Sequence, residues 1–209
     1  IYLNWIKDKN VALVANQTSI VANSHLVDTL LKSGVKIEKV FCPEHGFRGE
    51  AEAGEKVENF KDKKTGVQVV SLYGEKKKPS KDDLKGVDIV LFDIQDVGAR
   101  FYTYISTMTL MMEACAELNI PLIILDRPNP NGHYIAGPTL EPQFSSFIGM
   151  HPIPIVHGMT MAEYAIMVNG EGWLKDKLKC NLKYVTVLNY DHKTLYTLPV
   201  KPSPNLPNM

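Results

Sequence analysis

The stretch VDIVLFDIQDVGARFYTY at residues 87–104 decides the fold of this chain. Its first part, Val87–Phe92, is short, rich in Val, Ile and Leu, and apolar on both faces. Such a run is typical of a strand that helices cover on both sides of a sheet. A polar loop begins at Asp93, and a helical pattern follows over about Thr103–Leu118. The stretch therefore predicts a strand, a loop and a helix in that order.

Runs of the same kind recur along the chain, with helical or loop segments between them. We predict strands at Val11–Ala15, Val35–Cys42, Val67–Leu72, Val87–Phe92, Pro121–Leu125 and Leu182–Leu188. Further helices are expected near Asn23–Lys32 and Met159–Val168. The second of these starts with a capping-box pattern, Thr160 with Glu163, and Gly170 is its expected end. This alternation predicts an α/β fold, a doubly wound, mostly parallel sheet with helices on both faces.

The composition restricts the classes of function. The 209 residues suit one large domain, or a domain with an appendage, and 44% hydrophobic residues can fill its core. Lys and Arg total 23, as do Asp and Glu, and no long basic stripe interrupts this balance. We therefore expect no nucleic acid as a partner. No run approaches the roughly 20 apolar residues that a bilayer requires, so we expect no membrane span.

Cofactor and metal signatures are missing from the sequence. Cys42, Cys115 and Cys180 are too widely spaced for a zinc knuckle or a CxxC redox pair. The chain contains no GxGxxG, GxxxxGK[ST] or HExxH motif. We therefore expect no cofactor and no metal site.

The segments after the predicted strands carry the unusual chemistry. Ligands of open parallel sheets bind in the crevice outside the carboxyl ends of the strands. The polar and aromatic residues that follow those ends include Asn16, Glu44, His45, Arg48, Tyr73, Asp93, Asp96, Arg100, Tyr102, Tyr104, Asp126, Arg127 and Asn129. Such long polar loops at one edge indicate a site there.

Arginine is reserved for three of these loops. Arg48, Arg100 and Arg127 each follow a strand-like run, whereas the other basic residues are lysines. The guanidinium fork binds a carboxylate or phosphate in a bidentate way and keeps its proton. The arginines therefore point to an acidic ligand, or else to three structural pairs with Asp or Glu.

Five loop sequences together resemble one family. They are CPEHGFRGEAEAGEKV (Cys42–Val57), SLYGEKKKPS (Ser71–Ser80), FDIQDVGARFYTYISTM (Phe92–Met108), DRPNPNG (Asp126–Gly132) and VHGMTMAEYA (Val156–Ala165). In this order they are similar to the exo-β-N-acetylmuramidases of the NamZ type. The resemblance runs from about Val11 to Asn208.

The resemblance implies a Rossmann-like N-terminal catalytic domain, which we expect over residues 1–198. The Pro/Asn-rich residues 199–209 resemble the junction to a smaller C-terminal domain, which we expect to be absent from this chain. Members of the family remove N-acetylmuramic acid from the non-reducing end of peptidoglycan fragments. The expected partners are thus muramyl saccharides and the missing domain, and the expected location is extracytoplasmic, secreted or periplasmic.

The resemblance also assigns roles in the site. Glycoside hydrolysis needs a general acid, here Glu44, and usually a second carboxylate, for which Asp93, Asp96 and Asp126 are candidates. The acetamido group of the substrate is an alternative nucleophile. Arg48 or Arg100 would bind the lactyl carboxylate of the sugar. The remaining expected substrate-binding residues are Asn16, His45, Tyr73, Tyr102, Tyr104, Arg127, Asn129 and His157.

Two other classes of function stay open. One is a carbohydrate- or peptidoglycan-binding module that is inactive as a truncated fragment. The other is a metal-dependent phosphoesterase that uses Asp93, Asp96 and Asp126.

Overall fold

The computed structural model describes residues 2–44, 46–48 and 59–203, and its main feature is a seven-stranded sheet with the order β5-β6-β4-β1-β7-β8-β9. Every neighbouring pair is parallel except β5 with β6. The strands are β1 (Asn10–Ala15), β4 (Lys36–Cys42), β5 (Phe60–Lys61), β6 (Gln68–Ser71), β7 (Ile89–Asp93), β8 (Leu122–Leu125) and β9 (Leu182–Val185). All six predicted strands are confirmed. The sequence did not predict β5, a two-residue edge strand.

The topology identifies where a ligand binds most readily. Numbered in chain order, the six parallel strands lie as 3-2-1-4-5-6, which is a doubly wound arrangement. From β1 the chain moves to β4 on one side, whereas from β7 it moves to β8 on the other. The switch point of the topology therefore lies between β1 and β7, and ligands of such sheets bind outside the carboxyl ends of strands at this place.

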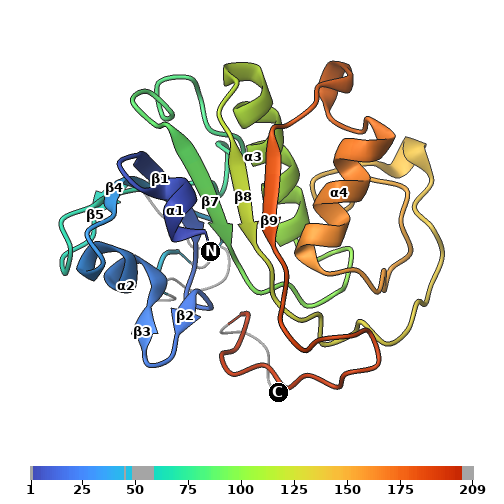
Figure 1. The fold of residues 1–209 in the computed structure, drawn as a ribbon. Coiled ribbons are helices and arrows are strands. Elements are labelled where there is room, and N and C mark those ends of the chain that lie inside the picture. Colours follow the sequence, from blue (N-terminus) through green and yellow to red (C-terminus); the bar gives the residue numbers. More distant parts are fainter. Residues whose placement is uncertain (1, 45, 49–58, 204–209) are drawn as a thin grey trace.

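Helices cover both faces of the sheet, as predicted (Figure 1). On one face α1 (Leu3–Ile6) and α2 (Leu26–Lys32) enclose an apolar core, and on the other α3 (Tyr104–Leu118) and α4 (Met161–Glu171) enclose a second one. Neighbouring residues of β7 serve both, since Leu91 packs in the first core and Phe92 in the second. The remaining elements are the hairpin β2 (Ile20–Val21) with β3 (Ser24–His25) and the 3-10 helices η1 (Pro142–Phe144) and η2 (Lys175–Lys177).

Helix α4 confirms the predicted capping box and corrects the predicted end. The Thr160 hydroxyl accepts from the Glu163 amide, and the Glu163 carboxylate accepts from the Thr160 amide. The helix passes through Gly170 and ends at Glu171, and its C-cap is Gly172, which adopts a left-handed conformation with φ +69°. This left-handed C-cap favours glycine, whereas Gly170 lies inside the helix.

Residues 186–203, the C-terminal arm, pass beneath the carboxyl ends of the central strands (Figure 1). Contacts along its length bind the arm to the domain. His192 lies 3.1 Å from the Gly132 carbonyl, Tyr190 lies 3.3 Å from the Asn129 backbone, and Pro202 accepts from Tyr104. Within the described ranges, no helix is both long and apolar enough to cross a membrane. The proposed boundary between residues 198 and 199 stays a prediction.

Candidate active site

Residues from the loops after β1, β4 and β7 act on the hydroxyl of Tyr104, the first residue of α3. Burial raises the pKa of Tyr104, and the nearby Tyr102, Asp96 and Glu44 raise it further. The Asn16 carboxamide lies beside the same hydroxyl. Residues distant along the chain thus meet at the switch point of the sheet.

Glu44 lies two residues beyond β4 and pairs with Tyr73, which lies two residues beyond β6. The Tyr73 hydroxyl is within hydrogen-bond reach of the Glu44 carboxylate, and desolvation together with this contact raises the pKa of Tyr73. Glu44 is half-buried. The arrangement presents a carboxyl group whose orientation a phenol restrains, at a place that solvent reaches.

Asp96 lies in the loop after β7 with one oxygen bound and the other unpaired. Its Oδ2 accepts from the Gly98 amide at 2.9 Å and lies 3.6 Å from Nε2 of His157. The His157 Nδ1 accepts from the Met159 amide at 3.2 Å, so the neutral imidazole carries its proton on Nε2, toward Asp96. Asp96 Oδ1 has no hydrogen-bond partner among the described residues.

Asn16 directly follows β1 and is fully buried. Its Oδ1 accepts from the amide and the hydroxyl of Thr18, at 2.9 and 2.6 Å. The Thr18 hydroxyl also accepts from the Gln95 amide at 3.0 Å, which joins the loops after β1 and β7. Thr18 and Gln95 were not predicted as site residues, although both belong to polar segments directly after strands.

Tyr102 and Tyr104 lie together, as their spacing suggested, but in different surroundings. Their ring centroids are 5.9 Å apart in an edge arrangement. Tyr104 is buried and its hydroxyl donates to the Pro202 carbonyl, so it serves the core and the arm. Tyr102 is half-buried, and burial followed by the charges of Asp96 and Glu44 raises its pKa.

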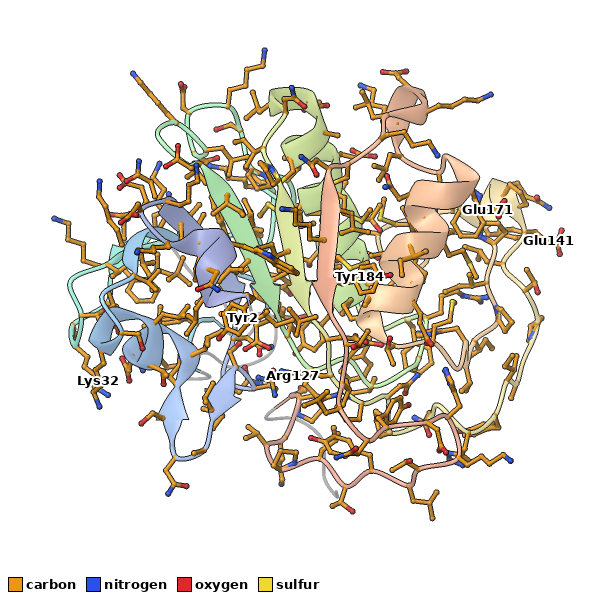
Figure 2. All side chains as sticks on the ribbon, viewed as in Figure 1. Tyr2, Lys32, Arg127, Glu141, Glu171 and Tyr184 are labelled. Carbon is orange, nitrogen blue, oxygen red and sulfur yellow. The ribbon has the colours of Figure 1, made fainter. Side chains whose placement is uncertain are left out.

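Asp93 forms a bidentate ion pair with Arg127. Nε and one terminal nitrogen of Arg127 donate to the two carboxylate oxygens at 2.6 and 2.9 Å. The Asp93 side chain is only 3% exposed. Arg127 lies just below the ends of the central strands (Figure 2). For this arginine the structural-pair alternative is the one observed.

Arg48 is also paired with carboxylates of its own chain. It donates to both oxygens of Asp62 at 2.9 Å and to Asp28 at 3.1 Å. The hydrogen bond with Arg48 is the main cause that lowers the pKa of Asp62 to about 2. Lys64 contacts the other Asp28 oxygen at 2.6 Å. This cluster connects α2 to the segment before β6.

Arg100 differs from the other two arginines. Its guanidinium donates to the backbone carbonyls of Pro138, at 3.0 Å, and of Ile153. Within the described part of the chain it makes no ion pair with a carboxylate.

Two other predicted residues have structural contacts. Asp126 accepts from the Ala162 amide at 2.9 Å, in the first turn of α4, and burial raises its pKa. Asn129 donates to the Met159 carbonyl and accepts from the Asn131 amide, each at 2.8 Å. His45 lies outside the described residues. The roles that we assigned to all these residues toward a ligand stay predictions.

The cysteine thiols are enclosed and keep their protons. All three cysteines are buried, and burial raises the pKa of the Cys42 and Cys180 thiols to about 12 and that of Cys115 well above its usual value. Among the residues that the structure describes, no three His, Cys, Asp or Glu side chains are grouped to bind a metal ion.

Comparison with known proteins gives the family. The model for the family described as "Exo-beta-N-acetylmuramidase NamZ, N-terminal" matches residues 11–209. The chain belongs to the NamZ N-terminal family. This confirms the resemblance carried by the five loop sequences.

Individual relatives extend the comparison. The chain is 46% identical over 217 residues to peptidoglycan beta-N-acetylmuramidase NamZ of Bacillus subtilis (strain 168). The aligned region covers 100% of this chain and 51% of that protein. Two crystal structures of DUF1343 family proteins from Bacteroides fragilis NCTC 9343 share the fold. One has a TM-score of 0.89 with 48% identity over 99% of this chain and 55% of that chain. The other has a TM-score of 0.83 with 38% identity over 92% and 48%. The chain thus spans about half the length of these relatives.

Proposed function

We propose that this chain is the catalytic domain of an exo-β-N-acetylmuramidase, a glycosidase that removes β-linked N-acetylmuramic acid from the non-reducing end of peptidoglycan fragments. The observation that carries the proposal is that the charges of Glu44 and Asp96 both act on Tyr102 and on Tyr104, at the switch point of a NamZ-family domain. Two carboxylates at a ligand-binding edge supply what glycoside hydrolysis requires.

In this mechanism Glu44 donates a proton to the leaving glycosidic oxygen. Tyr73 restrains the carboxyl group through their contact, so that the acid is positioned before substrate arrives. Asp96 is the better candidate for the second carboxylate, because its Oδ1 is unpaired among the described residues whereas both oxygens of Asp93 bind Arg127. Asp126 is engaged at the start of α4.

The existing contacts also decide between the two candidate arginines. We propose Arg100 rather than Arg48 as the group that binds the lactyl carboxylate. Arg48 already binds two carboxylates, whereas the described residues provide none to Arg100.

Three further parts of the proposal concern the whole protein. The strand order supports describing the domain as Rossmann-like. We propose that a C-terminal domain, like the other half of the relatives, completes the cleft. We also propose an extracytoplasmic, secreted location, since peptidoglycan lies there.

The test compares two substrates, 4-nitrophenyl β-N-acetylmuramide and the disaccharide of N-acetylmuramic acid β-linked to N-acetylglucosamine. Glu44→Gln should lower the rate on the disaccharide by about 10²- to 10⁴-fold, the usual contribution of a general acid. The loss should be smaller on the nitrophenyl substrate, because nitrophenolate leaves without a proton. Glu38→Gln is the matched control, since Glu38 is an exposed residue of the same strand β4.

The result also separates the two other classes of function. Binding of muramyl saccharides without hydrolysis would favour the binding module. Chelator-sensitive release of phosphate from 4-nitrophenyl phosphate, with no glycosidase activity, would favour the phosphoesterase. Wild-type rates for Glu44→Gln on the disaccharide would remove Glu44 from the mechanism.

A further inference from the structure

Two buried polar atoms near Tyr104 have no partner among the described residues, Nδ2 of Asn16 and Oδ1 of Asp96. The residues that carry them are 0% and 5% exposed. A buried donor or acceptor without a partner costs free energy, and a buried carboxylate oxygen costs more than a neutral group. Such atoms require a partner, and none of the described residues provides one.

The chemical identity of each atom follows from the contacts on its other side. Asn16 Oδ1 accepts two hydrogen bonds from Thr18, which makes the opposite atom of the carboxamide the NH₂ donor. Asp96 Oδ2 accepts from the Gly98 amide, which leaves Oδ1 as an acceptor. The place therefore offers one donor and one acceptor.

The two side chains belong to one site. Asn16 follows β1 and Asp96 follows β7, and these strands are adjacent, with Ala15 paired to Asp93. The Thr18 hydroxyl connects the two loops through Asn16 Oδ1 and the Gln95 amide. The charge of Asp96 raises the pKa of Tyr104, and the nearby Asn16 side chain lowers it. The pair therefore lies at the topological switch point.

A secondary amide complements this pair. It has one N–H donor and one C=O acceptor, which point in opposite directions in the planar trans form. A hydroxyl or a carboxylate would match the pair less completely. We propose that Asn16 and Asp96 form a subsite for the 2-acetamido group of the sugar, in which Asp96 Oδ1 accepts from the amide N–H and Asn16 Nδ2 donates to its carbonyl. This inference rests on the proposed function and specifies how that site selects its substrate. In it Asp96 acts as the second carboxylate by orienting the acetamido group, which is the alternative nucleophile, and not by attacking the sugar itself.

The end of the C-terminal arm contacts the neighbours of this subsite, Tyr104 and Gln17. The Pro202 carbonyl accepts from the Tyr104 hydroxyl and, at 2.9 Å, from the Gln17 side chain next to Asn16. Sugar entry therefore requires residues 201–203 to move away from Tyr104, and binding is expected to displace this part of the arm.

The experiment measures binding without turnover. The affinities of free N-acetylmuramic acid and of 3-O-lactylglucose, which has a hydroxyl in place of the acetamido group, are compared by calorimetry. Wild-type protein should bind N-acetylmuramic acid about 10-fold more tightly or better, since a hydrogen bond to a charged group contributes this much. Equal affinities would overturn the inference and assign the two atoms to buried water.

The preference should disappear in Asp96→Asn. The asparagine can still accept from Gly98 through its oxygen, and it then presents an NH₂ donor to the amide N–H. Asp82→Asn, an exposed aspartate replaced in the same way, should keep the wild-type preference. The ratio of two affinities does not depend on the folded fraction, so partial unfolding of a variant does not obscure the result. An unchanged ratio in Asp96→Asn would also overturn the inference.

The two proposals fail separately. A preference for the acetamido sugar without any hydrolysis would contradict the muramidase and support the subsite. Hydrolysis by a protein that binds both sugars equally would support the muramidase and contradict the subsite.

Discussion

Arg127 binds Asp93 through two parallel hydrogen bonds, at 2.6 and 2.9 Å, and joins the ends of β7 and β8 in doing so. The pair is nearly sealed from solvent, with side chains 17% and 3% exposed. Because both groups are desolvated, removal of one partner leaves a buried charge unpaired and is costly. Replacement of both partners by uncharged residues is less costly.

Removal of Arg127 alone should strongly destabilise the domain. Arg127→Ala leaves the Asp93 carboxylate buried and unpaired, and we expect a loss of about 3–5 kcal/mol in the free energy of unfolding. Urea denaturation measures this loss. The double variant Asp93→Asn with Arg127→Met should recover much of it. A single variant within about 1 kcal/mol of wild type would contradict the buried pair.

Gly98 should tolerate no side chain. Its φ is +75°, and an added Cβ would overlap the Asn129 carboxamide. Gly98→Ala should cost roughly 2 kcal/mol or more and lower activity, because the Gly98 amide positions Asp96. Gly170→Ala is the matched control. It introduces the same methyl group into open space within α4 and should stabilise by about 0.5–1 kcal/mol. Thermal melting of both variants, together with their hydrolysis rates, checks this prediction.

His151 should make the domain less stable in mild acid. It stacks on Trp173 with ring centroids 5.0 Å apart, and burial lowers its pKa to about 4, against a partial opposing effect of Glu113. Because the unfolded chain takes up the proton near pH 6.5, stability is fully present above that pH. It is lost as the pH falls toward 4.

The size of this loss is ~1–2 kcal/mol between pH 7.5 and 5. Unfolding by urea at the two pH values measures it, and His151→Phe should remove that part of the pH dependence. His25, whose pKa burial also lowers, contributes equally to both proteins. An identical pH dependence in the variant would disprove the assignment to His151.

The end of the arm should open more often when the two side chains that donate to it, Gln17 and Tyr104, are replaced. Gln17→Ala with Tyr104→Phe deletes the side-chain donors to the Lys201 and Pro202 carbonyls. Each lost hydrogen bond contributes about 0.5–1.5 kcal/mol, so the open population should rise several-fold. Chymotrypsin cleavage after Tyr196 should accelerate accordingly. Tyr184→Phe, on the exposed side of β9, is the control and should be cleaved at the wild-type rate. Equal rates for all three proteins would show that these bonds do not hold the arm.

The fold was predictable because each central strand is buried on both faces and therefore reads as a short apolar run. The sequence did not predict β5, because its two residues, Phe60 and Lys61, are both exposed and too few to show an alternation of apolar and polar side chains. The end of α4 was misplaced by two residues because Gly170 and Gly172 are equivalent in sequence. Only the backbone conformation distinguishes them.

The grouping of candidate residues at the strand ends was predictable from the sequence, but their ion pairs were not. The rule that ligands bind at strand ends placed Asn16, Glu44 and Asp96 in one region, and the structure brings them to Tyr104. Which carboxylates the arginines neutralise depends on tertiary contacts. Arg127 reaches Asp93, 34 residues away along the chain, and Arg48 reaches Asp62, 14 residues away. The residues next to each arginine in the sequence do not indicate these partners.

The buried thiols have a practical use. Because Cys42, Cys115 and Cys180 are enclosed in the cores and keep their protons, maleimide reagents, which attack accessible thiolates, should leave the native protein unmodified. A single cysteine introduced at exposed Lys193 would then carry a fluorophore at one defined position. The movement of the arm over the acetamido subsite could be followed by its emission, with every natural residue of both cores kept in place.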